Sequence, residues 1–90
     1  MSDANEPTLS ITVTGTDRPG VTGALLGAVA EVGAEVLDIQ QVVVHDHLTL
    51  TLLLAPSVPD AAATGREALE HLRDVAAVAA HRLDLTLSVT

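Results

Sequence analysis

The sequence ITVTGTDRPGVTGALL, residues 11–26, contains the two patterns that decide the fold. Its first residues alternate apolar and polar, which is the period of a half-buried strand. A run of turn-forming residues, Gly15 to Gly20, then interrupts the alternation. Beyond it, apolar residues recur at the spacing of a helix. The stretch therefore predicts a strand, a short loop and a helix in succession.

The same two periods continue to the end of the chain. Gly33 is placed to end the first helix, His45 to His47 form a polar connection between two strands, and Asp60 is placed to cap a second helix. Met1 to Pro7 offer nothing to bury and are expected to be a disordered leader before a domain over residues 8–90. The expected strands are Thr8–Gly15, Glu35–Val44, Leu48–Ala55 and Arg82–Val89, and the expected helices are Gly20–Val32 and Asp60–Ala79.

This order of elements predicts an α+β fold of the ferredoxin-like βαββαβ type. Two right-handed crossovers around a hairpin give a four-stranded antiparallel sheet of order 4-1-3-2, with both helices on one face. The leucine and valine positions of the strands would meet the helices. The opposite face would carry Thr12, Thr14, Thr49 and Thr51, with an apolar strip at Val42, Val44 and Leu53 that depends on the register. Such an open face usually meets another copy or another domain.

Composition excludes several classes of function. The chain has 90 residues, enough for one domain, with a net charge of −8 and no Phe, Tyr or Trp. Acidity and the absence of stacking side chains argue against nucleic acid as a partner. The absence of cysteine excludes disulfides and thiolate chemistry, and no apolar run is long enough to span a membrane. The acidic start does not match a secretory signal, so a cytoplasmic protein is expected.

The loop from Gly15 to Gly20 is the first candidate for function. A glycine-rich approach to a helix N-terminus exposes backbone N–H groups that suit a carboxylate, such as that of an amino acid. Asp17 could hold an ammonium group and Arg18 an anion. The alternative is structural: Thr16 or Asp17 caps the helix while Pro19 shapes its first turn.

Together with EVGAEVLDIQQVVV at residues 31–44, the opening stretch resembles the ACT domain, a ferredoxin-like regulatory module of enzymes in amino-acid metabolism. The likeness is greatest to the N-terminal ACT domain of actinobacterial phosphoserine phosphatases, which carry a D-R-P-G or D-Q-P-G loop before a similar helix. The resemblance implies an amino acid effector held between two copies, at Gly15, Asp17, Gly20 and Glu35. It also implies a homodimer or a second ACT domain as partner.

The resemblance includes departures at the implied site. Gly15 stands where the serine-binding pattern has a histidine, and Asp17 and Glu35 stand where that pattern has asparagines. Two carboxylates disfavour the carboxylate of a ligand and favour its ammonium group. Serine is therefore one candidate effector among several.

Two further groups of residues are candidates for chemistry. His45 and His47, two apart, would face the same way on a strand and could share a metal, but no third ligand is near in sequence. The acids Asp17 and Asp38 could form a pair, yet no nucleophile motif accompanies them. We expect no cofactor, no metal and no catalysis by this chain, which would be a regulatory domain or, alternatively, a ligand-free dimerisation module.

Overall fold

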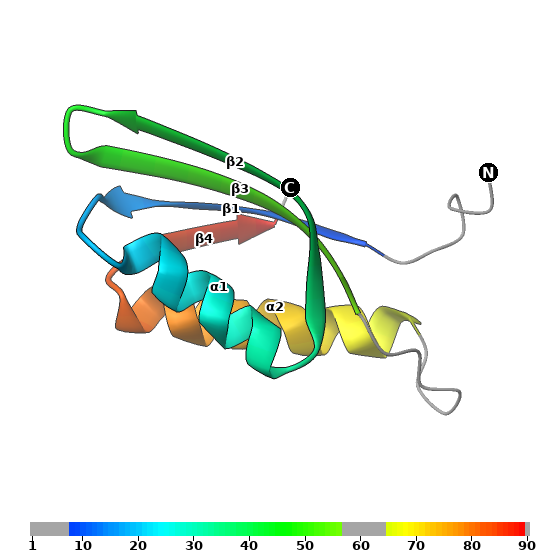
Figure 1. Cartoon of the computed structure of the whole chain (residues 1–90). Helices are drawn as coiled ribbons and strands as arrows, with labels where there is room; N and C mark the ends of the chain where they lie inside the picture. The colour runs from blue at the N-terminus through cyan, green and yellow to red at the C-terminus, as the bar shows by residue number, and fades with distance from the viewer. Residues whose placement is uncertain (1–7, 57–64, 90) are drawn as a thin grey trace.

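The computed structural model describes residues 8–56 and 65–89 of the chain. Its elements follow the expected order (Figure 1). They are β1 Leu9–Thr16, α1 Val21–Glu31, β2 Ala34–Val44, β3 His47–Pro56, α2 Gly65–Arg82 and β4 Thr86–Val89. The expected Met1–Pro7 leader and the Asp60 cap lie outside the described residues.

The four strands form one antiparallel sheet of order β2-β3-β1-β4, which confirms the predicted topology. Both helices lie against the same face of the sheet, and β2 and β4 form its two edges (Figure 1). Ile11 of β1 pairs with Val89 of β4, and Gly15 of β1 pairs with Leu48 of β3. The start of β1 therefore lies beside the end of β4.

The core lies between the sheet and the helices and is entirely aliphatic among the described residues. Alternate residues of β1 and β3 point into it, as the period of two requires. Burying these side chains stabilises the fold by roughly 1.5–3 kcal/mol for each large one. The buried core residues are Leu9, Ile11, Val13, Val21, Leu25, Val29, Leu48, Leu50, Leu52, Leu54, Leu72, Ala76, Ala80 and Leu85.

The opposite face of the sheet is rich in threonine, as the alternation predicted. Thr12 and Thr51 face each other across β1 and β3, with their hydroxyl oxygens 3.4 Å apart. Val42 is paired with Thr49 on this face and is 48% exposed. Leu53 is half-buried. The register therefore places the predicted apolar strip of Val42, Val44 and Leu53 on this face, toward the β2 edge of the sheet.

The first helix stops at the glycine expected from the sequence to end it, Gly33. Gly33 has φ of 82°, and its N–H donates to the carbonyl of Ala30 at 3.0 Å. This left-handed residue stops the helix with little steric cost because it has no Cβ. Val32, the last residue of the helix expected over Gly20–Val32, is the C-cap and is exposed. The helix itself therefore ends one residue earlier, at Glu31.

The second helix is longer at its C-terminus, and the last strand shorter, than the sequence predicted. The helix continues to Arg82 instead of ending at Ala79, and the strand begins at Thr86 instead of Arg82. Leu85 N–H donates to Ala80 and Asp84 N–H to His81, with Asp84 at φ 61°. These two bonds form a Schellman motif, which satisfies carbonyls at the end of the helix. The motif uses residues that the alternation of leucines had assigned to the strand.

Neither described helix combines the length and the hydropathy that crossing a membrane would require.

Candidate functional site

The loop between β1 and α1 contains a tight turn. The N–H of Val21 donates to the carbonyl of Arg18 at 3.2 Å, with Pro19 and Gly20 between them. Gly20 has φ of 85°. Proline followed by a residue with positive φ is the preferred sequence of a type II turn. The turn delivers the chain directly into α1, whose N-cap is Gly20.

No side chain caps α1, which corrects the cap expected at Thr16 or Asp17. Thr16 is the last residue of β1, and the N-cap is Gly20. The first turn of a helix carries N–H groups without helical partners and the positive end of the dipole. The start of α1 therefore keeps donors suited to a carboxylate.

Two hydrogen bonds fix the loop to its surroundings. The N–H of Asp17 donates to the carbonyl of Asp46, in the turn between β2 and β3, at 2.7 Å. The guanidinium of Arg18 donates to the carbonyl of Leu83, at the C-terminal end of α2. Arg18 thereby places its positive charge at the negative end of that helix. The loop is thus held between the hairpin and the α2–β4 turn, and Arg18 is already engaged.

Gly15 serves packing in this arrangement. A Cβ at this position would lie 2.5 Å from Cδ2 of Leu85 and 3.3 Å from the carbonyl oxygen of Asp84. The α2–β4 turn therefore closes directly onto the backbone of Gly15. At Gly20, by contrast, a Cβ would meet nothing within 4 Å, so the surface beside the turn is open.

Glu35 lies at the other end of the sheet within one chain. It pairs with Ala55, whereas Gly15 pairs with Leu48, seven residues earlier on β3. At ~3.3 Å per residue, this offset corresponds to about 23 Å. The structure brings Gly15, Asp17 and Gly20 together in one loop and places Glu35 on an exposed edge strand away from them.

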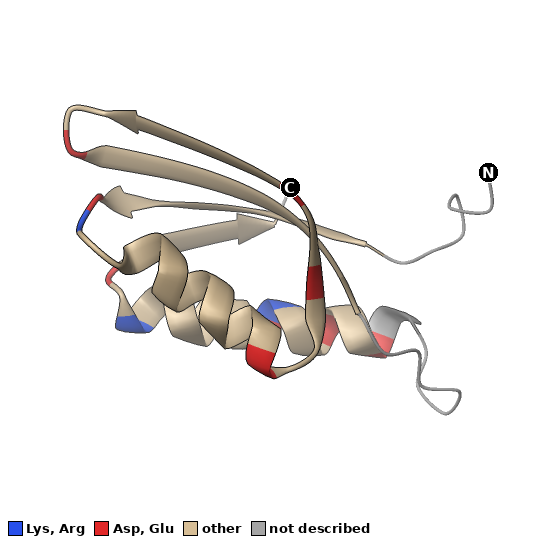
Figure 2. Ribbon diagram, viewed as in Figure 1, with Lys and Arg blue, Asp and Glu red and all other residues tan. Residues whose placement is uncertain are grey.

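The end of the sheet that carries the loop is mainly acidic. Asp17 is half-buried in the loop, Asp46 lies in the hairpin turn and Asp84 follows the end of α2. Figure 2 shows acidic positions in all three connections at this end, with a basic position in the loop before α1. Sequence reasoning identified Asp17 and Arg18 but not the partners Asp46 and Leu83, because only the folded topology brings these connections together.

The structure does not bring the histidine pair or the acid pair together as chemical sites. His45 lies in the hairpin turn with φ of 55°, whereas His47 is the first residue of β3, so the two do not share a strand. Asp38 pairs with Leu53, toward the end of the sheet opposite Asp17. Within the part of the chain that the structure describes, no three His, Cys, Asp or Glu side chains gather to hold a metal ion.

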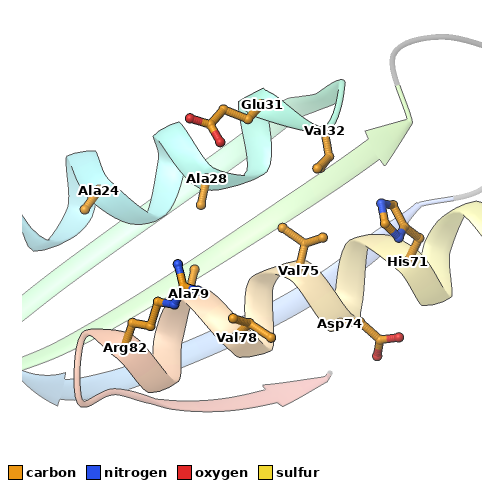
Figure 3. A pocket seen from close by; sticks show the side chains of 10 residues that line it. All are labelled: Ala24, Ala28, Glu31, Val32, His71, Asp74, Val75, Val78, Ala79 and Arg82. Carbon is orange, nitrogen blue, oxygen red and sulfur yellow. The ribbon is translucent and has the colours of Figure 1, made fainter.

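A groove of about 460 Å³ lies between the two helices, away from the loop. Alanines of α1 and apolar residues of α2 form its walls, and Figure 3 shows Ala28 and Val32 across from Val75. Its titratable residues lie on both helices: Glu31, His71, Asp74 and Arg82. None of the ligand-site residues predicted from the sequence (Gly15, Asp17, Gly20 and Glu35) lines this groove.

The topology is that of the ferredoxin-like βαββαβ fold, and comparison with known proteins gives the family. The model of the ACT domain family matches residues 7–90. The chain therefore belongs to the ACT domain family. An ACT domain protein from Streptococcus pneumoniae has the same fold, with a TM-score of 0.71 at 22% identity, covering 96% of this chain and 90% of that one.

Two curated relatives are longer enzymes. The chain is 40% identical over 79 residues to phosphoserine phosphatase SerB2 of Mycobacterium tuberculosis, which covers 88% of this chain and 18% of the relative. It is 40% identical over 48 residues to phosphoserine phosphatase of Streptomyces coelicolor, covering 53% of this chain and 12% of the relative. The chain thus spans less than a fifth of the length of either relative. The resemblance expected from the loop and strand motifs is confirmed.

Proposed function

We propose that this ACT domain is a regulatory unit that binds an amino acid effector between two copies of the domain. The loop Gly15–Gly20 of one copy would supply the donors for the ligand, and Glu35 of the other copy would complete the site. The phosphoserine phosphatase relatives favour an enzyme of serine metabolism as the regulated partner.

The observation that carries this proposal is the separation of Glu35 from the loop. The two lie at opposite ends of the sheet within one chain, yet Glu35 is exposed on the edge strand β2. If two β2 edges run antiparallel about a two-fold axis, the start of one β2 lies beside the end of the other. The end of β2 leads into the hairpin turn that binds the loop through Asp46. A second copy therefore supplies the position that a single chain lacks.

The chemistry of the loop sets the orientation of the ligand. The uncapped start of α1 offers N–H groups to a carboxylate, and Asp17 offers negative charge to an ammonium group. Arg18 donates to the carbonyl of Leu83, so its positive charge lies beside the end of α2 while its other N–H groups face solvent. Glu35 adds a second carboxylate, so the site would favour a ligand whose ammonium group can reach both acids.

The test is amide-shift mapping during titration with serine and a panel of other amino acids. Shifts are expected in residues 15–23 and at Glu35, and Asp17→Ala should remove them without unfolding the domain. Asp74→Ala is the matched control, because it removes an exposed carboxylate from α2, away from both the loop and the β2 edge. Shifts confined to the hairpin turn, or no shifts in a confirmed dimer, would reject this site.

The second candidate is a dimerisation module that binds no ligand. The acidic residues that replace the asparagines of the serine-binding pattern favour it, as does the exposed apolar surface of β2. A thermal-shift panel discriminates the two, since a ligand that binds only the native state must raise its stability. If no amino acid shifts the thermal unfolding midpoint of a confirmed dimer, the ligand-free dimerisation module is favoured.

We also propose that the role of this chain is regulatory and that it hydrolyses no phosphoserine. The D-x-D-x-T/V signature associated with phosphoserine phosphatases does not occur in the sequence. The test is phosphate release by the pure 90-residue chain. Hydrolysis that disappears when one of its own acids is replaced would contradict the proposal.

A further inference from the structure

The groove between the two helices opens on the side of the domain that faces away from the sheet. None of the residues that line it is buried, so it is accessible to another molecule along its whole length. The helices run antiparallel, and Ala24 near the start of α1 therefore lies beside Ala79 and Arg82 near the end of α2 (Figure 3). At the other end, Val32 lies across from His71. The groove thus has two distinguishable ends.

Exposed valines lie on both walls of this groove. Val78 on α2 is 53% exposed, and Val32 at the end of α1 is 38% exposed. Among the described residues, every other exposed large hydrophobic side chain lies on a strand. Ala24 and Ala28 add apolar surface with little volume on the α1 side. Contiguous apolar surface bordered by charges marks a contact surface, so the helix layer offers one that is separate from the loop and from β2.

The second helix carries two stripes of residues, and only one of them serves the core. Leu72, Ala76 and Ala80 recur every four residues and are buried against the sheet. The other stripe lines the groove and consists of His71, Val75, Val78 and Arg82. Its steps of four, three and four residues are the repeat of a helix that packs along another helix. The outer stripe is therefore suited to a second helix.

The two ends of the groove carry opposite charges that are not neutralised within the chain. Arg82 lies at one end and Glu31 at the other (Figure 3). Neither forms an ion pair with any residue that the structure describes. A second carboxylate on the wall, Asp74, already pairs with Arg73, with Nη2 and Oδ1 3.5 Å apart. Glu31 is also the last residue of α1, at the negative end of its dipole, so its own helix does not stabilise it.

These charges make the helix face complementary to itself in one orientation. A two-fold axis that lies in the plane of contact and runs across the helices turns the second copy end for end. It brings Arg82 of each copy over the Glu31 end of the other. An axis along the helices would instead bring Arg82 beside Arg82 and Glu31 beside Glu31, and like charges across an interface repel.

We propose that a second copy of this chain docks on the helix face, groove against groove, with the two α2 helices crossing antiparallel at Val78. Val78 is the most exposed apolar residue of the outer stripe and lies between Val75 and Arg82. Arg82 of each copy binds Glu31 of the other. The inference goes beyond the proposed function, because neither the loop Gly15–Gly20 nor Glu35 lines this groove.

The crossing point is tested by single-cysteine cross-linking, because the chain has no cysteine of its own. Packed helix axes lie about 8–10 Å apart and Cα atoms about 2.3 Å from each axis, which leaves facing Cα atoms roughly 3.5–5.5 Å apart. Val78→Cys should therefore cross-link under mild oxidation about tenfold faster than Ala77→Cys. Ala77 is the exposed neighbour that does not line the groove. Equal rates would overturn the crossing point.

The charge pairing is tested by exchanging the two charges between chains that also carry Val78→Cys. Glu31→Arg makes both ends of the groove positive, and Arg82→Glu makes both ends negative. Each variant alone should cross-link about fivefold more slowly, because like charges then meet. An equimolar mixture should return to within about twofold of the Val78→Cys rate, because opposite charges meet again at both ends. A mixture that links no faster than its components would overturn the orientation.

Association is measured by sedimentation at a series of concentrations. Val78→Asp places a carboxylate at the crossing point and should raise the Kd of the helix-face contact about tenfold or more, because the charge would be buried without a partner. Ala77→Asp is the matched control: it adds the same charge to the same helix outside the groove and should change the Kd by less than about twofold. Circular dichroism checks that both variants fold. Equal weakening by the two would overturn the proposal.

These results separate the inference from the proposed function. Cross-linking at Val78→Cys in a chain that shows no amide shifts with any amino acid retains the inference and rejects the effector site. Amide shifts at residues 15–23 and Glu35, in a chain whose Val78→Cys variant does not cross-link, do the reverse.

Discussion

The backbone N–H of Asp17 donates to the carbonyl oxygen of Asp46 at 2.7 Å, joining the loop before α1 to the tip of the β2–β3 hairpin. Because the bond uses the main chain, it does not depend on the Asp17 carboxylate. Asp17→Ala should change the free energy of unfolding by no more than about 0.5 kcal/mol. Asp17→Pro deletes the donor and should cost about 0.5–1.5 kcal/mol. Urea unfolding followed by circular dichroism measures both, and equal losses would mean that the carboxylate holds the loop.

The positive φ of Gly20 predicts that a methyl group is costly there. Gly20→Ala should destabilise the domain by about 1–2 kcal/mol, because an L-residue is strained in the left-handed region. Gly27→Ala is the matched control: it lies within α1, and its Cβ would meet nothing within 4 Å. It should stabilise by about 0.5–1 kcal/mol. The two alanines should shift the unfolding midpoint in opposite directions, and shifts of the same sign would contradict the assigned conformation of Gly20.

The contact between Gly15 and Leu85 predicts a second cost of a different origin. Gly15→Ala would place its Cβ 2.5 Å from Leu85 and should cost about 1–3 kcal/mol through overpacking. Leu85→Val shortens the facing side chain, so the double variant should lose less than the sum of the two single losses. Strictly additive losses, measured by the same unfolding experiment, would show that the two residues do not touch.

Asp84 occupies a position that usually belongs to glycine. Its φ of 61° completes the Schellman motif after α2. Asp84→Gly should raise the free energy of unfolding by about 0.5 kcal/mol, whereas Asp84→Val should lower it by at least about 1 kcal/mol. The thermal midpoints should therefore decrease in the order glycine, aspartate, valine. A valine variant as stable as the parent would rule out the left-handed conformation.

Neighbouring leucines on β3 should respond very differently to truncation. Leu52 is fully buried against the helices, whereas Leu53 is half-buried on the threonine-rich face. Leu52→Ala should cost about 2–5 kcal/mol, and Leu53→Ala about 1 kcal/mol or less. The comparison tests the register directly, because a slip of one residue would exchange the two effects.

The topology could be predicted from the sequence because apolar residues recur with the period of a strand or of a helix, and not both, in most elements. Leu9, Ile11 and Val13 alternate without interruption, and Val21, Leu25 and Val29 repeat every four residues. The error at the end of α2 came from residues that satisfy two patterns at once. Leu83, Leu85 and Leu87 alternate as a strand does, but Leu85 instead closes the helix through its bond to Ala80. A glycine at position 84 would have indicated the end of α2, because glycine is the usual residue at the left-handed position of the Schellman motif.

The candidate site was predictable only in part. Gly20 and Pro19 indicate a turn from their own preferences, and Gly20 adopts the positive φ that such a turn uses. Gly15 was assigned to ligand approach, whereas its nearest neighbour is Leu85, 70 residues later in the chain. The distance of Glu35 from the loop follows from strand register, which no local pattern encodes. The effector and the assignment of these residues to it stay predictions.

The pairing of Ile11 with Val89 means that the polypeptide enters and leaves the domain at one pole of the sheet. The loop, the hairpin turn and the Asp84 turn all occupy the other pole (Figure 1). A flanking segment attached at either side would therefore emerge from the pole opposite the loop Gly15–Gly20 of the same chain. Two such segments on one copy would leave the domain side by side, on the central strand β1 and the edge strand β4.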